Sequence, residues 1–396
     1  MAQRKKQLVL HYDALLREPY YLRARVDGNS PYDERVMSMP QLPIKGDEMA
    51  PPIHQPSVFH KGTYFFFIYN FENYYHFLYD TLPYLVFYNQ IEPRPKLLIA
   101  KAHTFRKFQI EMLSLLGIDI GRDVTYAEEN AQYEKLYVAT SLTHGVERAS
   151  GGSASNNPPE KEAYLIWEQL SRIVSIVPPP TPQPRKFYIS RRTHLHGDMS
   201  NIGTNYTTRR RCLNEDAVVA IAAAHGYAEI FCEKLSTAEK ITLFKNATHV
   251  LGFIGGGMAN LLFSSAQTNV GCILTPEFAR INTRFAHSMN HTSIKYLDIC
   301  KLAPFEGAFP LYTRVQIKDA SSPHNNKIGE VHGFTGDLCE VHFSNETVAG
   351  FSNDAELCVE NFRVGSLIPL DGGLNSPFVC DEEGLKAYLE SKDSAE

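Results

Sequence analysis

The sequence lacks the features of an exported, membrane-inserted or nucleic-acid-binding protein. No segment approaches the roughly 20 apolar residues that a membrane-spanning helix needs, and the apolar run in MAQRKKQLVLHY is too short for a signal peptide. The net charge of -5 provides no domain-wide basic surface for nucleic acid. We therefore expect a cytoplasmic protein with no transmembrane segment and no nucleic-acid partner.

Cysteine pairs are also missing. The seven cysteines are an odd number, lie far apart and never form a C-x-x-C motif. Such scattered cysteines are typical of reduced, mostly buried thiols rather than of a disulfide framework. Tryptophan occurs once, whereas 21 tyrosines and 23 phenylalanines supply aromatic rings, most of which we expect in the core.

The organisation of the chain is set by a proline run. Five prolines lie between residues 178 and 184, and such a run forms neither a helix nor a central strand. On both sides of it strand-like and helix-like segments alternate, which is typical of doubly wound α/β domains. From about residue 311, short strands and turn signals predict a small β-barrel, weakly similar to SH3-like barrels. We expect domains at 1–180, 185–308 and 309–372, followed by a tail at 373–396.

The stretch VLGFIGGGMANLLF, residues 250–263, contains three consecutive glycines, Gly255, Gly256 and Gly257, between an apolar strand and a helix start. Backbone N–H groups at such a turn converge on an anion. The turn is not a Walker A loop, because Met258 stands where lysine is required, and Asn260 replaces the last glycine of a dinucleotide fingerprint. A close packing turn that binds no ligand is the alternative.

Charged and polar residues follow other strands of the same half. Arg191 and Arg192 come directly after the strand-like KFYIS, where two guanidiniums fit a diphosphate. Solvated surface charge is the alternative for both. Further candidates at the carboxyl ends of strands or at a helix start are Arg210, Asn214, Glu215 and Glu277. We expect Asn214 to cap the helix that begins with Glu215, and Glu277 to accept hydrogen bonds from ribose hydroxyls.

These motifs, taken in order, resemble glycosyltransferase family 61, the DUF563 domain. The resemblance rests on KFYISRR, RRRCLNED, the run from EKLSTAEK to GGGMANLLF, TPEF, and NYYHFLYDTLPYL, which is similar to the family motif N-Y-x-H-x-x-x-D-x-L-P. It implies a GT-B fold with two Rossmann-like domains. It also implies an inverting transferase that takes a nucleotide sugar, most simply a UDP-sugar, without a metal or another cofactor. The acceptor would be a hydroxyl of a glycan or glycoprotein.

The resemblance assigns site residues one by one. Its motifs match Asn73, His76, Asp80, Arg191, Asn214, Glu215, Gly255, Gly257 and Asn260. The family usually reads G-x-H-G-A-G-L-x-N, and Ile254 stands in the place of that histidine. This departure supports an alternative, in which the chain is a decayed glycosyltransferase that serves as a binding or scaffold protein.

Asn73, His76 and Asp80 form a polar stripe at i, i+3 and i+7 on an otherwise apolar helix. Inverting glycosyl transfer needs a base for the acceptor hydroxyl. The base is Asp80, or His76, or His76 oriented by Asp80, and Glu215 is a third candidate. We place Asn73 on the acceptor side. A buried polar ladder with a structural role is the alternative.

A second rival uses the segment HLHGD. Its His194, His196 and Asp198 resemble the start of a metallohydrolase motif, although Met199 occupies the last histidine position. No D-x-D lies between strands to hold a metal-bridged donor. We therefore expect no metal at the site.

Overall fold

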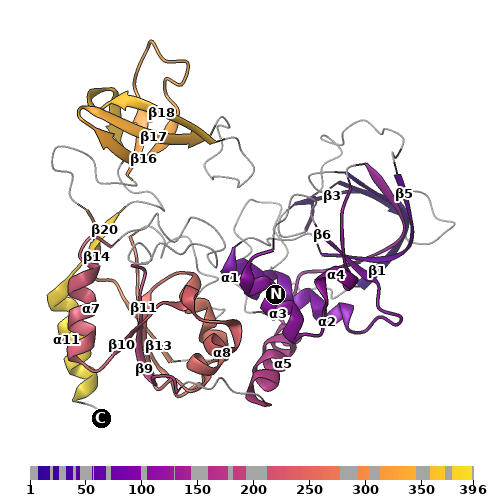
Figure 1. The fold of residues 1–396 in the computed structure, drawn as a ribbon, viewed down its shortest axis with the longest axis horizontal. Helices are drawn as coiled ribbons and strands as arrows, with labels where there is room; N and C mark the ends of the chain where they lie inside the picture. Colours follow the sequence, from indigo (N-terminus) through magenta and orange to yellow (C-terminus); the bar gives the residue numbers. More distant parts are fainter. Residues whose placement is uncertain are drawn as a thin grey trace.

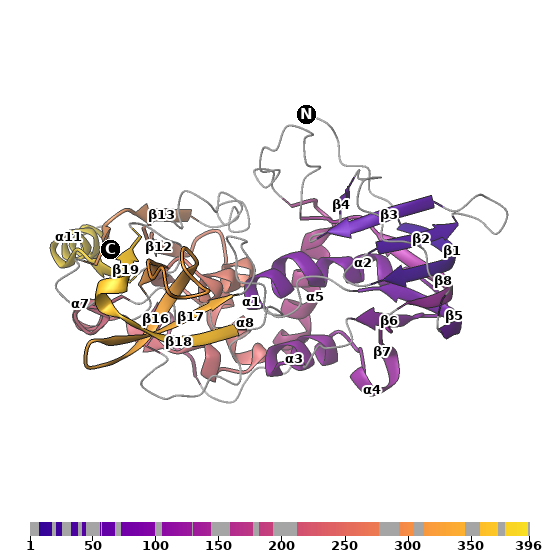
Figure 2. The ribbon, with the colours of Figure 1, turned by 90° about the horizontal axis from the view of Figure 1, so that it is seen from above.

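The described residues of the computed structural model form four sheets, one of them only two-stranded, with a layer of helices between the first two (Figures 1 and 2). It describes residues 8–17, 21–25, 33–38, 42–44, 56, 58–67, 73–99, 105–128, 130–143, 159–176, 182–192, 212–276, 293–303, 313–344, 357–370 and 377–394. Within these residues, no helix is both long enough and apolar enough to cross a membrane.

The first sheet is mixed rather than doubly wound. Its strands are β1 (Leu8–Arg17), β2 (Tyr21–Arg25), β3 (Asp33–Ser38), β4 (Leu42–Ile44), β5 (Val58–Phe66), β6 (Lys96–Ile99), β7 (Val124–Tyr126) and β8 (Ala131–Ala139), in the order β4-β3-β2-β1-β8-β5-β6-β7. Of these eight strands, β8, β5, β6 and β7 are parallel to one another. Strands β1 to β4 are antiparallel because their connections are too short for the crossover that parallel strands need. The prediction of a doubly wound first half was therefore wrong.

The helices that follow β5 cover the carboxyl end of the parallel strands. The predicted helix around Pro83 is broken into α1 (Tyr74–His76), the π-helical η1 (Phe77–Thr81), the 3-10 helix η2 (Leu82–Tyr84) and α2 (Leu85–Tyr88). The next helices are α3 (Lys107–Leu115), α4 (Ile120–Asp123) and α5 (Ala163–Ile176). Trp167 of α5 donates a hydrogen bond from Nε1 to the carbonyl of Leu78 at 2.9 Å, which ties α5 to the broken helix.

The second sheet is fully parallel and confirms the predicted α/β alternation of the second half. Its order is β10-β9-β11-β12-β13, with β9 (Lys186–Ile189), β10 (Ala228–Ile230), β11 (His249–Phe253), β12 (Asn269–Ile273) and β13 (Ser293–Leu297). Helix α7 (Glu215–Ala224) packs on one face, and α8 (Thr237–Lys245) with the 3-10 helix η6 (Gly256–Phe263) packs on the other. The short helix η5 (Cys232–Lys234) precedes α8, and Ser236 with Glu239 forms its capping box.

The two halves share one hydrophobic core. Helices α1 and α5 of the first half contact η6 and α8 of the second. Buried side chains from both halves, such as Phe77, Trp167, Ile189 and Leu261, belong to one continuous cluster. The helices that follow the first sheet are therefore fixed against the second sheet (Figure 2).

The C-terminal sheet is curled and antiparallel, with its own small core (Figure 1). Its order is β18-β17-β16-β15-β19, with β15 (Arg314–Ile317), β16 (Ile328–Thr335), β17 (Leu338–Ser344), β18 (Leu357–Arg363), η7 (Val364–Ser366) and β19 (Leu367–Pro369). The described strands β18 and β19 are edges that do not pair with each other, so the predicted barrel is an open sheet in this part of the chain.

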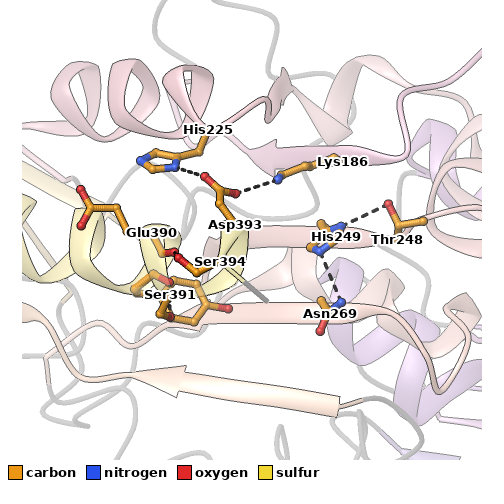
Figure 3. Close-up of polar contacts among 10 residues, drawn as sticks. Lys186, His225, Thr248, His249, Asn269, Glu390, Ser391, Asp393 and Ser394 are labelled. Atoms are coloured by element: carbon orange, nitrogen blue, oxygen red, sulfur yellow. Dashed lines mark hydrogen bonds and ion pairs between the residues drawn. The ribbon is translucent and has the colours of Figure 1, made fainter. Parts of the chain in front are cut away.

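The end of the chain returns to the second sheet. Strand β20 (Phe378–Cys380) pairs with β14 (Cys300–Leu302), and α11 (Glu382–Asp393) packs on α7. Leu385 and Leu389 are buried in the same cluster as residues of the parallel sheet. Figure 3 shows the far end of α11, where Asp393 bonds His225 and Lys186.

Candidate active site

The glycine turn lies where the winding of the second sheet changes direction. Strands β9 and β11 are neighbours, and the helices that follow them, α7 and η6, pack on opposite faces. Ligands of parallel α/β sheets bind at such a switch point, outside the carboxyl ends of the strands. The residues after β9 and the turn after β11 therefore lie together, as the sequence predicted.

The three glycines of the turn have different surroundings. A Cβ atom at Gly257 would lie 2.8 Å from Cγ2 of Ile189, and one at Gly255 would lie 3.1 Å from Nη1 of Arg191. A side chain at Gly257 would therefore force a shift, whereas one at Gly255 would only press against the end of the Arg191 side chain. Around Gly256 no atom of the described residues lies within 4 Å of such a Cβ. Packing against the described residues therefore does not require glycine there.

Arg191 is held against the turn. Its Nη1 donates to the carbonyl of Ile254 at 3.3 Å, and its backbone N–H donates to Oε1 of Glu215 at 2.7 Å. The same Glu215 oxygen accepts from the hydroxyl of Tyr188 at 2.8 Å. Burial raises the pKa of Glu215 and lowers that of Arg191. Glu215 is 4% exposed, so it anchors the strand end that carries Arg191.

Arg192 points to a different set of partners. Its guanidinium forms two hydrogen bonds with Glu229, at 3.0 Å and 2.6 Å, and one with Asp216 at 2.5 Å. These carboxylates raise the pKa of Arg192, the Glu229 hydrogen bond being the largest cause. The structure therefore brings Arg191, but not the Arg192 guanidinium, into contact with the turn.

Asn214 occupies the N-cap position of α7, but its side chain does not cap the helix. Its amide instead donates to the carbonyl of Cys380 at 2.9 Å, and its Oδ1 accepts from the Cys380 N–H at 2.9 Å. Asn214 thus ties β20 to the start of α7. Arg210, Glu277 and the HLHGD residues His194, His196 and Asp198 lie outside the described residues.

The polar stripe of the first half forms a hydrogen-bonded chain. Nδ1 of His76 lies 2.6 Å from Oδ2 of Asp80, and the hydroxyl of Thr143 donates to Oδ1 of Asp80 at 2.9 Å. Asp80 is 2% exposed, whereas the His76 side chain is 34% exposed. Both carboxylate oxygens of Asp80 are thus occupied in the interior, and the imidazole reaches the surface.

Thr143 follows β8, and His76 follows β5, its parallel neighbour in the first sheet. The residues at the two ends of this hydrogen-bonded chain, Thr143 and His76, therefore both follow the carboxyl ends of neighbouring parallel strands. Asn73 accepts a hydrogen bond from the backbone N–H of His76 at 3.3 Å, so it caps α1.

Tyr74, at the start of the helix that carries His76, contacts the helix that follows the glycine turn. The hydroxyl of Tyr74 lies 2.5 Å from Oδ1 of Asn260, whose Nδ2 donates to the carbonyl of Gly257 at 2.9 Å. The ammonium of Lys240 lies 4.8 Å from the centre of the Tyr74 ring, a cation–π contact. Burial raises the pKa of Tyr74 and lowers that of Lys240. The site therefore contains groups from both halves of the chain.

The sequence model of the family described as Glycosyltransferase 61 matches residues 74–271, half of the 396 residues. The chain belongs to the glycosyltransferase 61 family. The matched segment of this glycosyltransferase starts at Tyr74 and includes the His76–Asp80 pair, Thr143, Arg191 and the glycine turn. As a member of the family it transfers a sugar from a donor to a glycan acceptor. No curated protein matches the sequence significantly.

The family position that Ile254 fills is part of the core in this glycosyltransferase. Its side chain is 2% exposed, and its carbonyl is the acceptor for Arg191. That contact does not depend on the side chain at position 254. Among the described residues, no group of three histidine, cysteine or acidic side chains is placed to hold a metal ion.

Sequence reasoning missed Thr143, Tyr74 and Lys240. Thr143 is 63 positions from Asp80, and Tyr74 is 186 positions from Asn260. The available signals were weak: Tyr74 belongs to the first motif, and Lys240 is a charged residue on the apolar side of a predicted helix.

Proposed function

We propose that this glycosyltransferase is inverting and independent of metal, and moves a sugar from a nucleotide-diphosphate sugar, most simply a UDP-sugar, to a hydroxyl of a glycan or glycoprotein. The observation that carries the proposal is the bond between Tyr74 and Asn260. This bond ties α1, which ends at His76, to η6, which starts at the glycine turn, and so supports a single site for the His76–Asp80 pair and an anion-binding type of turn. The proposed donor side corresponds to the second domain of a GT-B enzyme.

In this mechanism His76 is the general base. An ionised carboxylate only accepts hydrogen bonds, so the Nδ1 of His76 carries the proton and donates it in a hydrogen bond to Asp80. The Nε2 of His76 therefore keeps its lone pair. Nε2 then removes the proton of the acceptor hydroxyl as its oxygen attacks C1 of the sugar. The C1–oxygen bond to the diphosphate breaks on the opposite face. Asp80 itself is buried and positions the imidazole.

The departing diphosphate is stabilised by backbone N–H groups of the glycine turn and by Arg191. Fixed donors and a guanidinium neutralise the charge that develops on the leaving oxygen, which is the work that a divalent ion performs in other transferases. Ile254 contributes its carbonyl to Arg191 and takes no part through its side chain.

The Gly256→Ala variant tests the donor site. The added methyl group meets no described atom in the free protein, so the unfolding temperature should stay within about 1 °C of the wild type, because surface substitutions without such contacts change stability little. The methyl group would, however, occupy the space of a phosphate on the turn, and donor affinity should fall about tenfold or more. Unchanged affinity for every nucleotide would place the donor elsewhere.

A panel of UDP, GDP, CDP, ADP and their common sugars, measured by thermal shift with and without EDTA, identifies the nucleotide. A shift with one nucleotide that survives EDTA supports the proposal, and a shift abolished by EDTA contradicts metal independence. Binding without release of nucleotide from any sugar in the panel, when glycan acceptors are also supplied, would favour the decayed binding protein, the alternative that rests on Ile254.

A further inference from the structure

Cys300 and Cys380 lie directly opposite each other in the two-stranded sheet of β14 and β20. The flanking backbone bonds run from Ala303 N to Pro377 O, 3.1 Å, and from Asp381 N to Ile299 O, 2.8 Å. Pairs in an antiparallel ladder alternate, so this arrangement makes Cys300 and Cys380 a non-hydrogen-bonded pair. The Cα atoms of such pairs are about 4.5 Å apart, which lies within the range that disulfides span.

The two side chains also face each other. Hydrogen bonding with Cys380, followed by burial, raises the pKa of the Cys300 thiol above its usual value. All seven cysteines are free thiols, and Cys380 is buried whereas Cys300 is partly exposed. The nearby Cys212 is engaged differently, because its Sγ lies 3.3 Å from Oδ1 of Asn214.

We propose that Cys300 and Cys380 form an intrachain disulfide by exchange with a small-molecule disulfide such as oxidised glutathione. The thiolate of Cys300, the more exposed of the two, attacks one sulfur of the oxidant and releases one thiol. Cys380 then attacks the mixed disulfide at the Cys300 sulfur and releases the second thiol. Two protein thiols are oxidised, one disulfide is reduced, and both protons end on the two released thiols.

This bond would link the two segments of the chain that connect the C-terminal sheet to the rest of the protein. Strands β15 to β19 all lie between Cys300 and Cys380, so the bond joins the chain where it leaves the second sheet to the chain where it returns. Cys380 is also the residue whose N–H and carbonyl bond the side chain of Asn214. The inference stands independently of the proposed reaction, because it rests only on the β14–β20 pair.

The test is to incubate the folded protein with oxidised glutathione, block the remaining thiols with iodoacetamide and digest it with trypsin without reduction. We expect YLDICK, residues 296–301, linked to VGSLIPLDGGLNSPFVCDEEGLK, residues 364–386. In a parallel sample that is oxidised but not alkylated, two fewer thiols should react with Ellman's reagent after denaturation. Because the thiol pKa is raised, the exchange should be faster at pH 9 than at pH 7.

The Cys300→Ser variant should lose the linked peptide, and Cys272→Ser, which removes a buried thiol of the parallel sheet, should keep it. The oxidised wild type should unfold at a higher temperature than the reduced form, and Cys300→Ser should show no such difference. A link between Cys212 and Cys380, or seven reactive thiols after long incubation at pH 9, would overturn the proposal. If Cys300→Ser folds poorly, Cys300→Ala provides the same comparison.

Discussion

The hydroxyl of Tyr74 and Oδ1 of Asn260 are 2.5 Å apart, although the two residues are 186 positions apart in the chain. Tyr74 begins the helix that carries His76, and Asn260 belongs to the helix that starts at the glycine turn. One hydrogen bond thus joins the helix that carries the proposed base in the first half to the helix that follows the proposed donor turn in the second. Asn260 is fully buried, so water does not replace the bond when it is lost.

Tyr74→Phe should therefore affect both stability and transfer. A buried acceptor left without its donor costs about 1–3 kcal/mol, so the unfolding temperature should fall by several degrees. The kcat of transfer should fall about tenfold, because the His76–Asp80 pair and the turn are no longer fixed together. Differential scanning calorimetry and nucleotide release measure the two effects. The control is Tyr164→Phe, since the Tyr164 hydroxyl makes no hydrogen bond in the described part of the chain.

Thr143→Val should lower kcat with little change in the donor KM. The variant keeps the shape of the side chain but removes the donor to Oδ1 of Asp80, and a hydrogen bond to a charged group is worth about 1.5–3 kcal/mol. The imidazole is then held less firmly, so we expect a loss of roughly tenfold to a hundredfold in kcat. Thr143→Ser should restore most of the rate.

His76→Ala removes the proposed base and gives the lowest kcat with which the Thr143 variants are compared. If Thr143→Val matches the wild type while His76→Ala is inactive, Thr143 has no positioning role. If Thr143→Ser is as impaired as Thr143→Val, the hydroxyl alone does not support the rate, and the inferred chain from Thr143 to His76 is wrong.

The sequence predicted the second half of the fold better than the first. Apolar runs such as HVLGFI and VGCIL, bounded by turn residues, indicate buried parallel strands, and parallel strands place their carboxyl ends at one edge. This is why Arg191 could be expected beside the glycine turn, as the structure confirms. The segment Gly256–Phe263, predicted as an ordinary helix, is a 3-10 helix, and its Gly257 packs closely against Ile189.

The first half depended on information that is not local. Strand β1 pairs with β8, more than 100 positions away, and its charged and aromatic residues do not reveal that partner. The same limit applies to the site: the i, i+4 spacing brings His76 to Asp80, but only the folded sheet brings Thr143 to them. The side chain of Asn214 shows the converse, since a residue favoured as a helix cap is used for a tertiary contact.

Arg191 and Arg192 are adjacent in the sequence but should behave differently. Arg191→Ala removes the guanidinium that contacts the turn, so the donor KM should rise about tenfold or more and kcat should fall. Arg192→Ala breaks the contacts with Glu229 and Asp216, so it should lower the unfolding temperature and leave the donor KM within about twofold. Steady-state kinetics together with thermal unfolding separate these results. A rise in donor KM for Arg192→Ala would return that residue to the donor site.

Asp393 should make stability depend on pH on the acidic side. The hydrogen bond from His225, followed by that from Lys186, lowers the pKa of Asp393 in the folded protein (Figure 3). A lowered folded pKa means that the contribution is fully present above the unfolded value of about 3.9 and is lost as the pH falls through the folded value. The gap in unfolding temperature between the wild type and Asp393→Asn should therefore be constant from pH 6 to about pH 4.5 and shrink below pH 4.

The matched control is Glu390→Gln, which removes a charge from the exposed side of the same helix without removing those two contacts. Its unfolding temperature should differ little from that of the wild type, and this difference should not shrink below pH 4 as it does for Asp393→Asn. Because α11 also carries Leu385 and Leu389 into the core beside α7, loosening its end should leave the helix in place. A gap for Asp393→Asn that widens as the pH falls from 5 to 3 would mean that the carboxylate destabilises the fold, and that His225 and Lys186 are not its partners in solution.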